Sequence, residues 1–69
     1  MLDVGDLVRI SEYQNIFNDW AREAWKNKTP FLIVGLSWGI PPGIWVVKLN
    51  DLNGRRFFLR EHQLKKIEQ

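Results

Sequence analysis

Cysteine is absent from this 69-residue chain, which excludes disulfides and thiolate metal sites as sources of stability. Histidine occurs once, at His62, and serine only at Ser11 and Ser37. A Ser-His-acid arrangement would therefore need an improbable geometry, and a Cys-His arrangement has no cysteine. The eight carboxylates are scattered singly and form no cluster with metal-ligand spacing. We expect a non-catalytic protein that carries no metal and no other cofactor.

Long hydrophobic runs are also missing. No apolar stretch approaches the roughly 18 to 20 residues that cross a bilayer, and the N-terminus has neither the basic start nor the apolar segment of a secretory signal. We therefore expect a cytoplasmic protein without a membrane partner. The length suits a single domain, residues 1–69, of a size at which one core is marginal.

The net charge is only +2, but it is unevenly distributed. Residues 1–43 carry four Lys or Arg against five Asp or Glu, a net charge of −1. Residues 44–69 carry six against three, a net charge of +3. The basic excess therefore lies in the C-terminal half.

Five stretches either alternate between apolar and polar residues or form short apolar runs rich in β-branched residues, and both patterns predict strands. The predicted strands are Val4–Ile10, Phe31–Trp38, Ile44–Leu49, Arg55–Arg60 and Leu64–Ile67. Gly35, in the middle of the second, predicts a bulge or bend. Both faces of the third are apolar, and we expect Trp45, Val47 and Leu49 to face the core.

Residues 11–28 differ, because their apolar side chains are spaced three or four positions apart, as in a helix. Asn18 or Asp19 would cap a short helix that ends at Ala24 or Trp25. The apolar stripe consists of Tyr13, Ile16, Phe17, Trp20, Ala21, Ala24 and Trp25.

Turn residues connect these elements. Gly5-Asp6 supplies the turn chemistry that lets the first strand begin close to another backbone, and the prolines in Gly39–Gly43 require a loop. Asn53-Gly54 predicts a hairpin, and the polar segment Glu61–Gln63 predicts one helical turn. The sum is a mainly β fold: a small five-stranded barrel with a short helical insertion between strands 1 and 2 and a single helical turn before the last strand.

The opening Gly5-Asp6-Leu7-Val8-Arg9-Ile10 and the ending from Phe58 to Ile67 resemble SH3-like barrel proteins. The opening is similar to that of KOW-type domains, although Ser11-Glu12-Tyr13-Gln14 stands where their glycine is expected. The ending is similar to the SH3-like accessory proteins of photosynthetic electron transport, such as the ferredoxin-thioredoxin reductase variable chain and the small SH3-like protein of photosystem I. The layout also resembles small phage-encoded barrels. These resemblances imply a viral protein or an accessory subunit that binds a larger protein.

Four tryptophans exceed what the interior of a small barrel readily holds, so some indole surface is expected on the outside. Each of Trp20, Trp25 and Trp38 either plugs a barrel end or contacts a partner. We predict a protein-binding surface formed by these three with Pro41 and Pro42, since tryptophan is enriched at interface hot spots. Recognition of proline-rich peptides would need a tyrosine-rich groove, and Tyr13 is the only tyrosine.

The alternative is a nucleic-acid-binding face, with guanidinium groups on phosphates and a ring on a base. Charge that protects an exposed edge strand from pairing would explain the same pattern. The predicted nucleic-acid-binding residues are Arg55, Arg56, Phe58, Arg60, Lys65 and Lys66.

Overall fold

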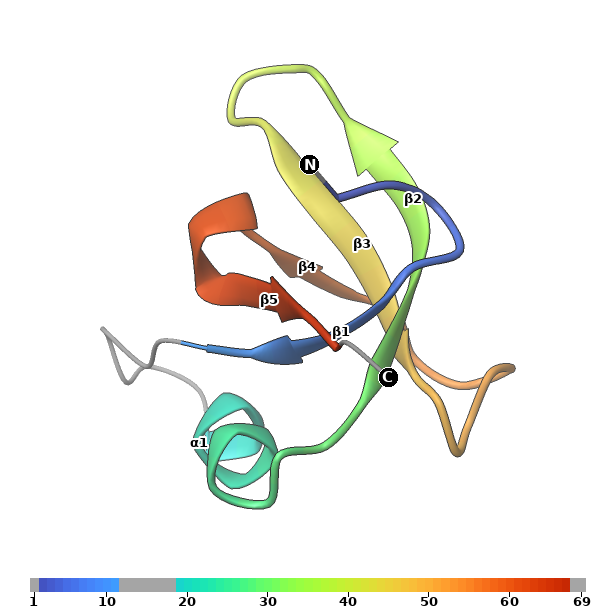
Figure 1. Cartoon of the computed structure of the whole chain (residues 1–69). Coiled ribbons are helices and arrows are strands. Elements are labelled where there is room, and N and C mark those ends of the chain that lie inside the picture. Colours follow the sequence, from blue (N-terminus) through green and yellow to red (C-terminus); the bar gives the residue numbers. More distant parts are fainter. Residues whose placement is uncertain (1, 12–18, 68–69) are drawn as a thin grey trace.

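The computed structural model describes residues 2–11 and 19–67. The predicted helical positions Tyr13, Ile16 and Phe17 and the possible cap Asn18 lie outside this part of the chain. The described elements follow one another as five strands, one α-helix and one 3-10 turn (Figure 1). They are β1 (Leu7–Ile10), α1 (Asp19–Lys26), β2 (Phe31–Ser37), β3 (Gly43–Lys48), β4 (Phe57–Leu59), η1 (Glu61–Gln63) and β5 (Leu64–Lys66).

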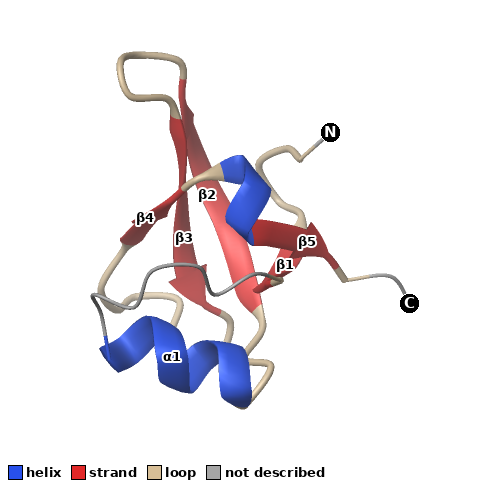
Figure 2. Ribbon diagram, turned by 90° about the vertical axis from the view of Figure 1, so that its left-hand side faces the viewer, coloured by secondary structure: helices blue, strands red, loops and turns tan. Residues whose placement is uncertain are grey.

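All five strands join one antiparallel sheet in the order β4-β3-β2-β1-β5. The sheet curls, so that β4 and β5 turn to the same side of β2 and β3, while α1 lies across one end (Figures 1 and 2). The predicted mainly β fold, with a helix between the first two strands and a helical turn before the last, is confirmed. Both edge strands have only three residues, which limits the unpaired backbone that they expose.

The chain enters β1 through a turn rather than by a strand that begins at Val4. The Asp6 N–H donates to the Asp3 carbonyl at 3.1 Å, and Gly5 has a φ of 95°, a conformation that glycine adopts at little cost. The Gly5 N–H then donates to the Ile33 carbonyl at 2.9 Å. The predicted close approach of Gly5-Asp6 to another backbone is confirmed, and Val4 is exposed.

The predicted irregularity at Gly35 is confirmed, because the register between β2 and β3 shifts between Ile33 and Gly35. The predicted core face of β3 is wrong in part. Trp45 is 41% exposed and Leu49 is also exposed, whereas Val47 is buried together with the opposite face of the strand. Since both faces of this segment are apolar, alternation alone could not choose between them. The smaller side chains of the other face occupy the interior, and the indole lies outside.

β3 and β4 pair antiparallel, with Trp45 opposite Phe58, so the predicted connection by a hairpin is confirmed. The connecting segment is longer than the Asn53-Gly54 pair predicted: β3 ends at Lys48 and β4 begins only at Phe57. The Asp51 N–H donates to the Lys48 carbonyl at 2.9 Å, and the Gly54 N–H donates to the Asp51 carbonyl at 3.0 Å. The connection therefore contains two successive turns, residues 48–51 and 51–54, rather than a two-residue loop.

The helix α1 ends in a Schellman arrangement one turn beyond its last buried residue. The Thr29 N–H donates to the Ala24 carbonyl at 3.0 Å, and the Lys28 N–H donates to the Trp25 carbonyl at 3.3 Å. Lys28 takes the left-handed conformation that this arrangement requires, with a φ of 53°. The helix therefore extends slightly past the predicted end, to Lys26.

Trp20 fixes α1 against the sheet. Its ring stacks on Phe57 at a centroid distance of 4.2 Å and an interplanar angle of 29°, and Phe57 in turn meets Phe31 edge to face at 6.2 Å. Every strand and the helix contribute to the one core that results. Its buried residues are Val8, Ile10, Ala24, Phe31, Ile33, Ile44, Val46, Phe57, Leu59 and Leu64.

Candidate binding groove

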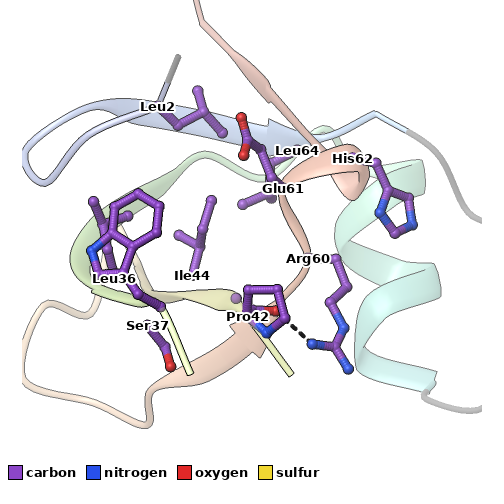
Figure 3. A pocket seen from close by; sticks show the side chains of 11 residues that line it. Leu2, Leu36, Ser37, Pro42, Ile44, Arg60, Glu61, His62 and Leu64 are labelled. Atoms are coloured by element: carbon purple, nitrogen blue, oxygen red, sulfur yellow. Dashed lines mark hydrogen bonds between the residues drawn. The ribbon is translucent and has the colours of Figure 1, made fainter. Parts of the chain in front are cut away.

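A groove of about 840 Å³ lies between the β2–β3 loop and η1. Leu36 and Ile44 stand at one end of it and Arg60 and His62 at the other, with Leu2 above (Figure 3). Its lining residues are Leu2, Leu36, Ser37, Trp38, Pro42, Gly43, Ile44, Arg60, Glu61, His62 and Leu64. The volume lies within the range of known ligand sites.

Arg60 connects the two walls of this groove. Its guanidinium donates a hydrogen bond from Nη1 to the Pro42 carbonyl oxygen, which joins the start of η1 to the β2–β3 loop (Figure 3). The same guanidinium lies 5.6 Å from the centre of the Phe58 ring, within the range of a cation–π contact. The contacts with Pro42 and Phe58 fix the position of the Arg60 side chain at the edge of the groove.

Gln63 holds the other end of η1. Its side-chain oxygen accepts a hydrogen bond from the Arg60 N–H at 2.9 Å, and its backbone N–H donates to the Arg60 carbonyl at 3.0 Å. The Gln63 carbonyl accepts from the Ser11 N–H at 2.8 Å, just after β1. This wall of the groove is therefore fixed to the sheet, and the side chains of Glu61 and His62 remain exposed.

The opposite wall is apolar and strongly exposed. Trp38 lines the groove with 81% of its surface exposed, and Ile40 in the same loop is fully exposed. Two large apolar side chains on one short loop form an unusual surface for a monomeric protein, since exposed apolar groups normally occur singly. An apolar wall that faces a polar one suits a ligand with one apolar and one polar side.

The β2–β3 loop rejoins the sheet at Gly43, where the Phe58 ring packs closely against the backbone. The Phe58 ring lies so close to this glycine that a Cβ there would stand 2.1 Å from Cζ of the ring. The ring also meets Trp45 at a centroid distance of 4.8 Å. Trp45 and Phe58 thus cover the outside of β3 where the loop rejoins the sheet.

The predicted protein-binding residues fall in different places. Trp38 and Pro42 line the groove, and Pro41 lies exposed in the same loop. Trp20 packs against the core. Trp25 is 42% exposed and lies on α1, away from the groove.

The predicted nucleic-acid-binding residues are not gathered on one face. Arg55 lies 5.5 Å from the centre of the buried Phe57 ring, whereas Arg60 lies beside Phe58, and successive residues of a strand point to opposite sides. Arg56 is exposed just before β4. Lys65 and Lys66 are on β5, at the other edge of the sheet. Lys66 pairs with Asp6, at 3.7 Å between Nζ and Oδ1.

The sequence did not point to Leu36 or Ile44 as site residues, because an apolar residue in a strand is normally interpreted as core, and Leu2, before the first predicted strand, carries no signal of its own. Ile40 was missed too, although an isoleucine between Gly39 and Pro41, outside any strand, has no obvious place in the core. The groove forms because η1 brings the end of the chain beside the middle loop, which local patterns do not encode.

Other classes of site are not found in the described part of the chain. No three His, Asp or Glu side chains come together there to hold a metal ion. No helix among residues 2–11 and 19–67 is long and apolar enough to cross a membrane.

Comparisons of the chain with protein-family models, curated proteins and solved structures find no match. The case for a function therefore depends on the groove and the surface of this chain.

Proposed function

We propose that the protein is a non-catalytic interaction module whose groove binds an extended segment of a larger protein partner. The observation that carries this proposal is Trp38, 81% exposed on the wall of the groove. Tryptophan is enriched among the residues that dominate binding energy at interfaces. The exposed indole would act as the anchor that the partner packs against. The groove beside it would accept a side chain of the partner.

The two walls favour a peptide segment over a compact apolar ligand. Trp38 and the half-buried Leu36 offer apolar contact, while Glu61 and His62 expose polar groups on the opposite side. An extended chain presents alternate side chains to opposite sides, so it meets both walls at once. Because Arg60 is hydrogen bonded to Pro42 across the groove, part of the site is organised before binding, which lowers the entropic cost of association.

We further propose that the sheet is a small SH3-like barrel. Support comes from the strand order β4-β3-β2-β1-β5, the curl that turns both edges to one side, and the 3-10 turn directly before β5. A phage-encoded factor or an accessory subunit, as the resemblance in the sequence implies, would use such a barrel as a scaffold for the groove.

The test begins with short random peptides displayed for selection on the intact protein. The affinity of the selected peptides is then measured against Trp38→Ala and against the control Leu52→Ala. Leu52 is a matched control because it is 53% exposed, lies in a loop and does not line the groove. We expect Trp38→Ala to weaken binding by about thirtyfold, or 2 kcal/mol, and Leu52→Ala to leave it unchanged.

Chemical-shift mapping with a selected peptide identifies the surface directly. We expect the largest changes at the backbone amides of Leu36, Ile44 and Glu61. The proposal is wrong if no peptide is enriched, or if the enriched peptides bind the Trp38→Ala and Leu52→Ala proteins equally well.

A further inference from the structure

A second surface, remote from the groove, carries opposed like charges. Arg9 on β1 is directly opposite Lys65 on β5 in the antiparallel register, so their side chains leave the sheet on the same face. Residues opposed in this way have Cβ atoms about 4.5–5.5 Å apart, and like charges there are destabilising. An anion that bridges the two side chains would remove this repulsion.

The C-terminal end of α1 extends the same basic surface. Arg9 also lines a hollow of about 340 Å³ together with Trp25, Lys26 and Lys28. Lys26 and Lys28 are exposed, and Trp25 exposes 42% of its surface there. Lys26 and Lys28 have a structural role as well, because cations stabilise a helix C-terminus. No such role accounts for the Arg9–Lys65 pair.

Few acidic residues of the neighbouring elements reach this surface. At about 100° per residue, Glu23 lies roughly 160° around α1 from Trp25 but only about 60° from Lys26, and Asp19 is in the first turn of the helix, away from its basic end. Asp6 pairs with Lys66. The Lys66 side chain projects from the face of β5 opposite to that of Lys65, because neighbouring residues of a strand point to opposite faces. Among the described residues of α1, β1 and β5, Glu23 is the one carboxylate that borders this surface, beside Lys26, against four cations.

We propose that this basic patch, formed by Arg9, Trp25, Lys26, Lys28 and Lys65, binds single-stranded nucleic acid. The four cations would contact successive phosphates, and the exposed indole of Trp25 would stack on a base. Stacking requires an unpaired base, since the bases of a duplex are already stacked on one another. An aromatic ring among cations therefore favours a single strand over a duplex or an acidic protein surface.

The experiment measures fluorescence anisotropy of a labelled oligothymidylate of about 15 nucleotides, a length near that of single-strand binding sites, with the full chain. Lys65→Gln and Lys26→Gln should each weaken binding severalfold and lower the slope of log affinity against log salt by about 0.7, the value for one phosphate of a single strand. Trp25→Ala should weaken binding roughly 5- to 100-fold, and Trp25→Phe should restore part of the loss.

Lys48→Gln is the matched control, because it removes one cation at the end of β3, which lies outside the basic patch and is separated from β1 by β2. It should change neither the affinity nor the salt slope by as much as Lys65→Gln does. Far-ultraviolet circular dichroism of each variant verifies that it is folded.

Three results would overturn the proposal. The first is no binding of the oligonucleotide at about 50 mM salt, where phosphate contacts are strong. The second is equal binding of a duplex together with no effect of Trp25→Ala. The third is equal competition by poly-glutamate at matched charge concentration, which would show that the patch recognises negative charge alone.

Discussion

At the scale of single residues, Lys28 is placed where a different residue would be more stable. Its φ of 53° is left-handed, and that conformation costs a residue with a Cβ about 1 kcal/mol, whereas glycine adopts it freely. Lys28→Gly should therefore raise the free energy of unfolding by about 0.5–1 kcal/mol. Urea denaturation, followed by the shift in midpoint at constant slope, measures the effect.

Lys26→Gly is the matched control for that substitution. It removes the same charge from the same end of α1, but Lys26 lies within the helix, where glycine costs about 1 kcal/mol relative to the best helix formers. The two variants should therefore shift stability in opposite directions. A loss of stability in both would show that the Lys28 side chain matters more than its backbone conformation.

In β3, residue types predicted that the strand is buried but not which of its faces points to the core. Ile44, Val46 and Val47 are all buried while Trp45 is outside, so the apolar content of the strand was informative and its face was not. The position of an indole depends on which neighbour is small, here Gly35, which is opposite Trp45 across the bulge. A cross-strand neighbour becomes known only once the register is known.

At the scale of elements, α1 depends on Trp20 for its attachment to the sheet. Trp20→Ala removes the ring stacked on Phe57. We expect the free energy of unfolding to fall by about 2–4 kcal/mol. Fully buried aromatic residues lose more than this at the upper end of the measured range, and Trp20 is only partly buried. Trp25→Ala on the same helix should cost under about 1 kcal/mol. Thermal or urea unfolding of the two variants measures the difference.

A double-mutant cycle of Trp20→Ala with Phe57→Leu isolates the ring contact from simple loss of area. A coupling energy of about 0.5–1.5 kcal/mol is expected for stacked aromatic side chains. Additive effects would mean that the helix is held by Ala24 and its other contacts rather than by the stacked pair.

The pairing of β1 with β5 yields a second prediction at this scale. Lys65→Glu converts the like-charged pair with Arg9 into an attractive one, so stability should rise by about 0.2–1 kcal/mol at low salt. Lys66→Glu, one residue further, replaces an ion pair with repulsion from Asp6 and should lower stability. Both effects should shrink as salt is added, because exposed charges are screened. Equal effects of the two substitutions would contradict this register.

Elements were the most predictable level of this protein. Period-two patterns and short apolar runs predicted all five strands to within a few residues, and Gly35 predicted the bulge. The ends were less predictable, because a strand stops where its partner stops: β4 is confined to Phe57–Leu59 by its pairing with residues 44–46. Of the residues that line the groove, Trp38 and Pro42 were singled out from residue type alone, while the opposite wall at η1 depended on tertiary structure.

At the scale of the whole molecule, the groove and the basic patch belong to different ends of the curled sheet. The β2–β3 loop and η1, which line the groove, lie toward one end of the sheet, and α1 lies across the other (Figures 1 and 2). In the patch, Arg9 on β1 connects the end of α1 to Lys65 on β5. Within residues 2–11 and 19–67, none lines both hollows. A protein with these two surfaces could hold a protein segment and a nucleic-acid strand at the same time.

This separation predicts independent binding. Saturation with the oligonucleotide should change the affinity of a groove-selected peptide by less than about threefold, since coupling requires that one ligand favour a different state of the other site. Isothermal titration of the peptide, with and without the oligonucleotide, measures the coupling, and the reverse titration must give the same factor. One shared core joins the five strands and α1, so a change of more than about tenfold would indicate that the sheet itself moves between two states. If the sheet does move, Trp20→Ala, which loosens α1, should alter the coupling. If the two sites are independent, Trp20→Ala should leave the peptide affinity of the folded protein unchanged.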